Sequence, residues 1–212
     1  MKSPTCRASI SVSCSEPSVI LNEVKNLKQI AVFASGSGTN FEALACACED
    51  GRIPARCVLM VCDKPGAAVI ERAARHGIPA FVFSPKDYPD KAAFEKEIVS
   101  RLDELGVDLV CLAGYMRIVG DVLLGAYRGR IINIHPSLLP SFKGAHAVED
   151  AVAYGVKVFG ITIHYVDESL DGGRIIAQRA FEYEGSDSAE VHRIGQAIEH
   201  QLYIETVNKL LK

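Results

Sequence analysis

Residues 131–140 read Ile-Ile-Asn-Ile-His-Pro-Ser-Leu-Leu-Pro, and the interpretation of the whole chain starts from this stretch. Its apolar residues follow the pattern of a short buried strand, which places Asn133 and His135 on one face at the carboxyl end. Open parallel sheets bind their ligands at that end of their strands. Pro136 and Pro140 end the strand and stiffen the segment that follows, because proline fixes its own φ. The stretch therefore predicts a strand that delivers two polar side chains to a ligand site.

An imidazole and an amide two residues apart suit the chemistry of acyl transfer. The imidazole of His135 can carry a proton near neutral pH, and the amide of Asn133 can donate to an oxygen that gains negative charge. The acidic loop at 167–173, Asp-Glu-Ser-Leu-Asp-Gly-Gly, supplies Asp171, a carboxylate that would set the tautomer of the imidazole and favour its charged form. These three groups predict acyl or formyl transfer by direct attack, without an activated serine or cysteine.

Plainer interpretations exist for both segments. A histidine near a strand end is often only packed or solvated, and a short motif such as Asn-x-His-Pro occurs by chance. Asp171-Gly-Gly is also a common turn sequence.

Size and composition narrow the class of protein. A chain of 212 residues with 49% hydrophobic content predicts one well-buried domain, and a net charge of -3 offers no basic field for nucleic acid. No apolar run approaches the ~18 residues that a membrane-spanning helix needs. The odd count of seven cysteines and the lack of a signal peptide favour reduced thiols in the cytoplasm. Cys46-Ala-Cys48 is too tight for a common zinc spacing, so no metal site is expected.

The order of apolar segments predicts the architecture. Residues 1–28 are serine-rich at first and lack periodicity, so we interpret them as a poorly ordered extension of a single domain at 29–212. Within the domain, strands alternate with helices, which is typical of a mainly parallel, Rossmann-like sheet flanked by helices. Strands are expected at 29–34, 57–62, 80–83, 108–112, 130–134, 158–166 and 174–183, and helices at 41–51, 67–76, 90–105, 146–154 and 191–211. The last two strands flank the acidic loop and are expected to pair antiparallel.

Two further segments follow predicted strands. Residues 35–40, Ser-Gly-Ser-Gly-Thr-Asn, precede a helix, and such a loop turns backbone N–H groups toward an anion at the positive end of the helix dipole. The loop lacks the lysine of a Walker motif and the third glycine of a dinucleotide fingerprint, which favours a monophosphate. Residues 113–119 follow another strand and are expected to line a slot for a flat ring. The alternative is that Met116 and Ile118 are simply core residues.

Four separated signatures carry a family resemblance: SGSGTN at 35–40, LAGYMRIV at 112–119, NIHPSLLP at 133–140 and HYVDESLDGG at 164–173. In this order they resemble the phosphoribosylglycinamide formyltransferase family over roughly residues 29 to 211. The resemblance implies a Rossmann-like formyltransferase fold and a role in purine biosynthesis. It implies transfer of the formyl group of 10-formyltetrahydrofolate to the amine of glycinamide ribonucleotide, with small molecules as the only partners, no metal, and a monomer or homodimer.

The resemblance also assigns roles to residues. His135 would be the proton donor, Asp171 the carboxylate that supports its charge, and Asn133 the group that holds the formyl oxygen. The substrate would be bound by Gly38, Thr39 and Asn40 at its phosphate and by Glu199 at its ribose. The folate site would be formed by Lys91, Met116, Arg117, Ile118, Val119, Asn133, Asp167 and Asp171.

Three details accompany the resemblance. Lys91 stands where the family often has an arginine, and it keeps the charge but not the planar fork. Lys143 stands where some relatives have a proline. The family often has a cis peptide bond in the NIHPSLLP segment, so Leu139-Pro140 is predicted to be cis.

His164 lies within a predicted strand and is expected to be structural.

Other activities share parts of this pattern. Formyltetrahydrofolate deformylase uses the same three catalytic groups with water as acceptor, but carries an amino-terminal sensing domain for which 28 residues are too few. Methionyl-tRNA formyltransferase adds a carboxyl-terminal domain and a basic surface for tRNA. A non-catalytic folate- or nucleotide-binding module would keep the pockets, yet it would not require all three of Asn133, His135 and Asp171.

Overall fold

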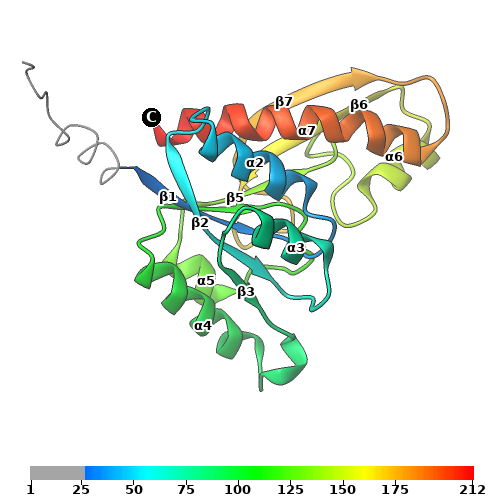
Figure 1. Ribbon diagram of the computed structural model, residues 1–212. Coiled ribbons are helices and arrows are strands. Elements are labelled where there is room, and N and C mark those ends of the chain that lie inside the picture. The colour runs from blue at the N-terminus through cyan, green and yellow to red at the C-terminus, as the bar shows by residue number, and fades with distance from the viewer. Residues whose placement is uncertain (1–26) are drawn as a thin grey trace, which may run out of the picture.

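The computed structural model describes residues 27–212, so the extension predicted at 1–28 lies almost entirely outside the described residues. These residues form a seven-stranded sheet of order β3-β2-β1-β4-β5-β6-β7 (Figure 1). The strands are β1 Lys28–Phe33, β2 Ala55–Cys62, β3 Ala80–Val82, β4 Leu109–Leu112, β5 Ile131–His135, β6 Val158–Tyr165 and β7 Ile175–Glu182. The helices are α2 Thr39–Glu49, α3 Ala68–Arg75, α4 Lys91–Glu104, α5 Asp121–Ala126, α6 Ala147–Tyr154 and α7 Ser188–Leu211, with one 3-10 turn at Pro85–Asp87.

The sheet is parallel from β3 to β5 and antiparallel from β5 to β7. The predicted mainly parallel architecture and the antiparallel pair at 158–166 and 174–183 are confirmed. The structure adds a second antiparallel contact, between β5 and β6, whose register places Asn133 opposite His164 and His135 opposite Thr162. Helix α5 was not predicted, because six residues give too few turns for a helical period to show.

Helices cover both faces of the sheet (Figure 1), and an apolar cluster lies on each face. One core cluster joins the sheet to α2, α3 and α7 and includes Ile132 and Ile134 of β5. The other joins the opposite face to α4 and α5 and includes Ile131. Because successive side chains of a strand point to opposite faces, Asn133 and His135 lie on the same face as Ile131. The strand thus directs Ile132 and Ile134 to one core, Ile131 to the other, and its last two odd positions to the site.

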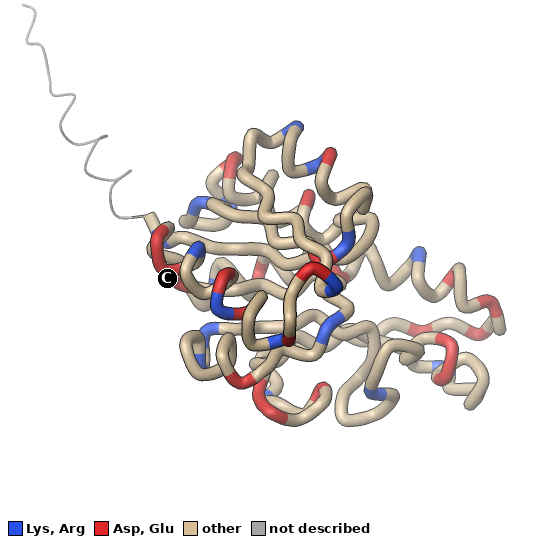
Figure 2. The backbone as a smooth tube through the Cα atoms, turned by 90° about the horizontal axis from the view of Figure 1, so that it is seen from below, with Lys and Arg blue, Asp and Glu red and all other residues tan. Residues whose placement is uncertain are grey.

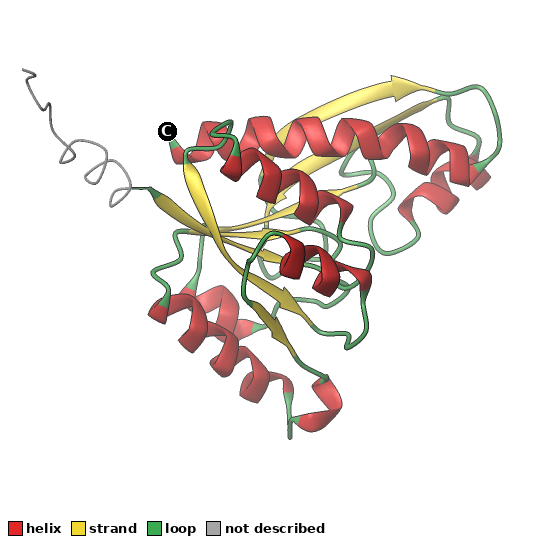
Figure 3. Ribbon diagram, viewed as in Figure 1, coloured by secondary structure: helices red, strands yellow, loops and turns green. Residues whose placement is uncertain are grey.

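Three adjacent parallel strands, β1, β4 and β5, end at the same edge of the sheet. The loops that follow them, drawn green in Figure 3, are the glycine loop at 35–38, the segment at 113–120 and the proline segment at 136–146. The peptide bond between Leu139 and Pro140 is cis, which confirms the prediction. The edge therefore gathers the segments that the sequence marked as functional.

Charged residues of both signs occur throughout the described residues. Basic and acidic residues are interspersed along the backbone, in keeping with a net charge of -3 (Figure 2). Between residues 27 and 212, no helix has both the length and the apolar character needed to cross a membrane.

Candidate active site

The antiparallel neighbour of β5 places His164 beside Asn133. The amide nitrogen Nδ2 of Asn133 lies 3.2 Å from Nε2 of His164. Nδ1 of His164 donates to the Tyr165 carbonyl at 2.8 Å, so Nε2 is the acceptor of the neutral ring. Burial lowers the pKa of His164 below its usual value, although the Tyr165 carbonyl and Asp171 act in the opposite direction. A neutral His164 thus accepts from Asn133 and fixes which way its amide faces.

Asp171 lies between two histidines. Its Oδ2 is 3.6 Å from Nδ1 of His135 and its Oδ1 is 3.7 Å from Nε2 of His164. The backbone N–H of Gly144 donates to Oδ2 at 2.8 Å, and this bond holds the carboxylate in place. The backbone of Asp171 has a φ of 45°, a left-handed conformation that is uncommon outside glycine. The loop therefore presents the carboxylate in one defined position.

His135 is buried, and each of its ring nitrogens faces an oxygen. Nε2 lies 2.8 Å from the Phe142 carbonyl, which can only accept, so Nε2 carries a hydrogen. The 3.6 Å between Nδ1 and Asp171 exceeds the length of a normal hydrogen bond. Nδ1 is thus not committed to the carboxylate. The structure brings Asn133, His135 and Asp171 together, as the sequence predicted.

The glycine loop ends at the amino terminus of α2. Gly38 has a φ of 73°, and a Cβ at this position would lie 2.5 Å from Cγ2 of Val69, so only glycine fits. The helix that follows directs its free N–H groups, the positive end of its dipole, toward the edge of the sheet. The predicted phosphate loop therefore has the local geometry of an anion site.

Helix α7 packs against the start of α2 and connects the predicted substrate residues. Asn40 Nδ2 donates to Oε2 of Glu199 at 2.7 Å, and Gln196 Nε2 donates to the Thr39 hydroxyl at 3.0 Å. A small hollow whose lining includes Pro136 and Glu199 lies beside these contacts. Glu199 thus belongs to the surroundings of the glycine loop, although 159 residues separate it from Asn40.

A buried carboxylate, Asp63, connects the glycine loop to the segment at 113–120. The Ser35 hydroxyl donates to Oδ1 of Asp63, and Arg117 Nε donates to its Oδ2 at 2.7 Å. The backbone N–H of Met116 donates in turn to the Ser35 hydroxyl at 2.9 Å. Asp63 was not predicted as a site residue. The signal available was its place directly after strand β2, at the same edge of the sheet.

The predicted folate residues at 116–119 differ in exposure. Met116 and Ile118 are 71% and 69% exposed, so the alternative that they are core residues is wrong. Val119 is buried in the core cluster next to α4 and α5. Lys91 begins α4, and its Cε lies 2.7 Å from the place where a Cβ on Gly120 would stand. Lys91 thus lies against the end of the segment that exposes Met116 and Ile118.

The loop at 166–174 leaves no space at one of its glycines. A Cβ on Gly173 would overlap the carbonyl oxygen of Tyr165. Because that oxygen belongs to the backbone, the overlap could be relieved only by moving the chain. Within the same loop Asp167 accepts from the backbone N–H of Ser169 at 2.9 Å. The loop that carries Asp167 and Asp171 is therefore closely packed against the end of β6.

Comparison with known proteins agrees with this geometry. Residues 28–207 match the model of the formyl transferase family. The chain belongs to that family. It is 52% identical over 186 residues to the phosphoribosylglycinamide formyltransferase of Bacillus subtilis (strain 168), a match that covers 87% of this chain and 95% of the relative.

Solved structures extend the likeness to three dimensions. The glycinamide ribonucleotide transformylase 1 of Geobacillus kaustophilus has a TM-score of 0.86 and 53% identity, covering 88% of this chain and 100% of that one. The phosphoribosylglycinamide formyltransferase of Bacillus halodurans has a TM-score of 0.84 and 53% identity, covering 87% and 96%. The family that the four signatures resemble is confirmed, and so is its fold.

His164 was expected to be structural, and the structure adds contacts that the sequence did not indicate. It is buried, contacts Asn133 and lies near Asp171. Its position in the HYVDESLDGG signature was visible in the sequence. The register between β5 and β6 was not, and that register brings the two side chains together.

Proposed function

We propose that this protein transfers the formyl group of 10-formyltetrahydrofolate to the amine of 5'-phosphoribosylglycinamide, a step of purine biosynthesis. The observation that carries the proposal is the convergence of Asn133, His135 and Asp171 at the edge that also holds the glycine loop, in a chain of the formyl transferase family. The high identity to named phosphoribosylglycinamide formyltransferases supports the choice of acceptor. Residues 29–212 would form the catalytic domain, and the described free thiols suit a reducing cytoplasm.

The ribonucleotide would bind between α2 and α7. Its phosphate would accept from the loop and helix N–H groups at Gly38, Thr39 and Asn40, where the helix dipole favours negative charge. Glu199, already paired with Asn40, would accept from hydroxyls of the ribose. The hollow beside Glu199 is also lined by Pro136, the residue that follows His135 in the sequence. A ribonucleotide bound in this way would extend its glycinamide amine toward the end of β5.

The folate would bind on the other side of the same edge. Met116 and Ile118 provide exposed apolar surface for a flat ring, and Val119 would contribute its backbone. The loop with Asp167 and Asp171 would close over the ring, near Asn133. Lys91 would pair with a carboxylate of the folate tail, as a point charge and not as a bidentate fork. Arg117 would act mainly by holding the segment in place, since it is paired with Asp63.

The reaction would proceed by direct attack. The amine forms a bond to the formyl carbon, and the carbonyl oxygen gains the negative charge. Asn133 would donate its second amide hydrogen to that oxygen, since the first is directed to His164. His135 would carry a positive charge beside it, supported by Asp171. The bond from carbon to the folate nitrogen then breaks as that nitrogen takes up a proton, and the attacking amine loses one.

Two effects would supply most of the rate enhancement. Holding both reactants in register contributes ~7 kcal/mol or more in well-oriented systems. An oxyanion donor contributes about 3 kcal/mol. The first depends on the glycine loop and the folate segment, and the second on Asn133.

A turnover assay tests the proposal. The protein is incubated with 10-formyltetrahydrofolate, with and without glycinamide ribonucleotide, and release of tetrahydrofolate is measured together with formylated ribonucleotide. The expected result is release that requires the ribonucleotide and matches the formylated product one to one. Release without the ribonucleotide would indicate a deformylase instead, and no release under either condition would indicate a binding module.

His164 provides a prediction on how Asn133 is held. Replacing His164 by leucine removes the acceptor of the Asn133 amide, so the amide loses its fixed orientation. We expect kcat to fall about tenfold, the equivalent of a hydrogen bond of about 1.4 kcal/mol, with little change in KM for the ribonucleotide.

The matched variant is His164→Gln, whose side-chain oxygen can still accept from Asn133. It is expected to recover part of the lost kcat. Equal losses in both variants, or a loss confined to KM, would show that His164 does not position the amide.

A further inference from the structure

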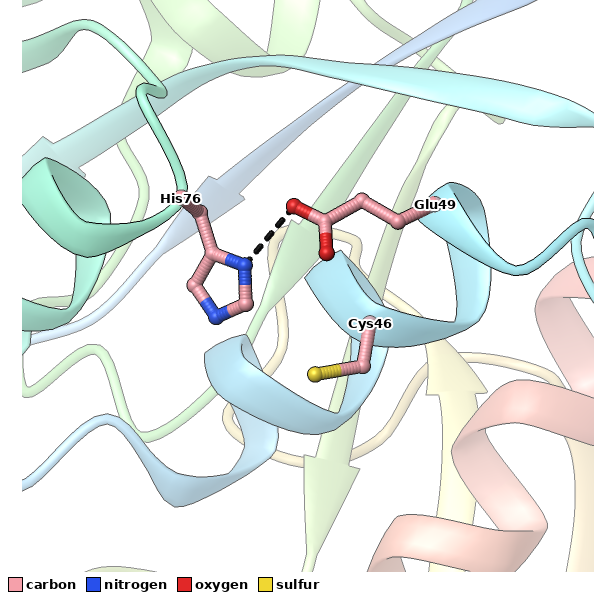
Figure 4. Close-up of side chains that lie close together, drawn as sticks. All are labelled: Cys46, Glu49 and His76. Atoms are coloured by element: carbon pink, nitrogen blue, oxygen red, sulfur yellow. Dashed lines mark hydrogen bonds and ion pairs between the residues drawn. The ribbon is translucent and has the colours of Figure 1, made fainter.

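Outside the site described above, three side chains of different chemistry are directed at one point. Cys46 and Glu49 lie one turn apart on α2, and His76 stands at the end of α3 (Figure 4). The thiol sulfur, a carboxylate oxygen and a ring nitrogen all lie within 4.8 Å of one another. Nδ1 of His76 is 2.7 Å from Oε1 of Glu49. The cluster lies about two turns along α2 from Thr39 and takes no part in the proposed reaction.

The surroundings of His76 resemble those of a metal-bound histidine. Its second nitrogen, Nε2, lies 3.2 Å from Oε1 of Glu42, so the ring is held between two carboxylates. Metal-binding histidines almost always donate their other ring N–H to such a group, which fixes the tautomer and orientation of the ring. Glu42 is itself held by Arg72 and Arg75. Glu42 thus holds the His76 ring by a contact that is independent of Cys46 and Glu49.

We propose that Cys46, Glu49 and His76 bind one Zn²⁺ ion, with water as the fourth ligand. Thiolate, imidazole and carboxylate are the three ligand types that zinc takes in proteins, and three protein ligands with one open position are typical of non-structural sites. The half-buried setting at the junction of α2 and α3 leaves the fourth position open to water.

The proposed ligands differ from the pair of cysteines that the sequence suggests. Cys46-Ala-Cys48 predicts no metal site, because its spacing is too tight for a common zinc motif. In the structure Cys48 packs against the core below α2 and α7, and Cys46 faces His76, which is 30 residues further along the chain. The partner of Cys46 is therefore a histidine on the next helix.

Without metal, hydrogen bonds from His76 to Glu49 and Glu42 hold the side chains of the site in place. The Glu49 and Glu42 carboxylates raise the pKa of His76, and burial together with nearby acids raises the pKa of Cys46. Zinc would replace the proton between His76 and Glu49 and release the proton of the thiol. Ligand atoms about 2.0 to 2.3 Å from the ion stand roughly 3.3 to 3.8 Å apart. The His76 and Glu49 atoms, now 2.7 Å apart, would therefore have to separate slightly, and the Cys46 sulfur would have to approach by up to about 1 Å. The cysteine and glutamate side chains can move this far without displacing the helices.

Binding is measured on the full chain with Zn²⁺ as the probe, by competition against a chromophoric chelator, and with Co²⁺, whose absorption spectrum reports thiolate coordination. We expect one ion per chain and a thiolate-to-cobalt charge-transfer band. His76→Asn and Cys46→Ser should each weaken Zn²⁺ binding by more than tenfold and remove the band in the case of Cys46→Ser. Glu42→Gln should weaken binding about 10- to 100-fold, because it removes only the outer partner of His76.

The chain offers two matched controls. His192 pairs with Glu149 at 3.2 Å on the surface without a thiol nearby, and Cys48 neighbours Cys46 without facing His76. His192→Asn and Cys48→Ser should leave the affinity and the band unchanged. As a measurement that needs no variant, Zn²⁺ should slow alkylation of Cys46 in the wild-type protein, as located by mass spectrometry. Binding that survives both His76→Asn and Cys46→Ser, or alkylation that zinc does not slow, would overturn the proposal.

Discussion

Replacing His135 by alanine is expected to lower kcat for formyl transfer by about 10²- to 10⁴-fold, the usual contribution of a group that donates or carries a proton in the transition state. The variant removes the only imidazole that lies beside both Asn133 and the Phe142 carbonyl among the described residues. The ribonucleotide should still bind with a similar KM, because the glycine loop and Glu199 do not contact His135. Initial rates at saturating concentrations of both substrates measure the effect.

His76→Ala is the control, since it removes an imidazole at the junction of α2 and α3 that takes no part in the proposed reaction. It should retain full activity. Because His135 is buried, thermal unfolding of both variants has to be compared with the wild-type protein, and only a folded His135→Ala variant counts. A folded variant that keeps kcat within threefold of wild type would remove His135 from the mechanism.

Replacing Gly173 by alanine is expected to lower kcat/KM by about 100-fold or more. The new Cβ would overlap the Tyr165 carbonyl oxygen, so the loop or the end of β6 has to shift. The backbone N–H of Tyr165 is bonded to the Arg174 carbonyl at 2.9 Å, so a shift there also disturbs the start of β7. Asp171 stands two residues before Gly173, and a displacement of about 1 Å at a reacting group can cost about 100-fold in rate. Overpacking should also lower the free energy of unfolding by about 1–3 kcal/mol.

Gly125→Ala is the control for this substitution. Gly125 is an exposed residue of α5, and no heavy atom lies within 4 Å of its added Cβ. Alanine there should leave activity unchanged and raise the free energy of unfolding by about 0.5–1 kcal/mol, because glycine is a poor helix residue. Urea unfolding and steady-state rates on both variants measure the two quantities. If Gly173→Ala were as active as Gly125→Ala, the position of Asp171 would not limit the reaction.

The parts of the fold that local patterns determine were predictable. Each buried parallel strand is a short apolar run between polar or glycine segments, and the predicted bounds differ from the observed ones by at most two residues, as for 29–34 against Lys28–Phe33. The cap and acidic first turn of the final helix, expected at 186–190 ahead of the run at 191–211, are confirmed: the helix begins at Ser188, and Asp187 accepts from the N–H of Ala189. Helix α5 escaped prediction because its six residues bury only Leu123 and Leu124.

The site was predictable where residues follow strands that end at one edge. Asn133, His135 and Asp171 were expected to converge, and the structure places them within a few ångström, while their catalytic roles remain predictions. His164 and Asp63 were missed because their roles depend on contacts between distant segments. Asn133 and His164 meet through the register of β5 and β6, and Ser35, Asp63 and Arg117 meet through side-chain hydrogen bonds that no spacing reveals.

The position of Asp63 has a consequence for altered specificity. The Asp63 carboxylate accepts from both Ser35 and Arg117, so a displacement of either segment is transmitted to the other. Under the proposed function, a mutation near Arg117 that alters the folate site would also displace Ser35 and weaken binding of the ribonucleotide phosphate. A variant whose folate specificity changes through this segment should therefore lose affinity for the ribonucleotide, and recovery would need a second change near Asp63.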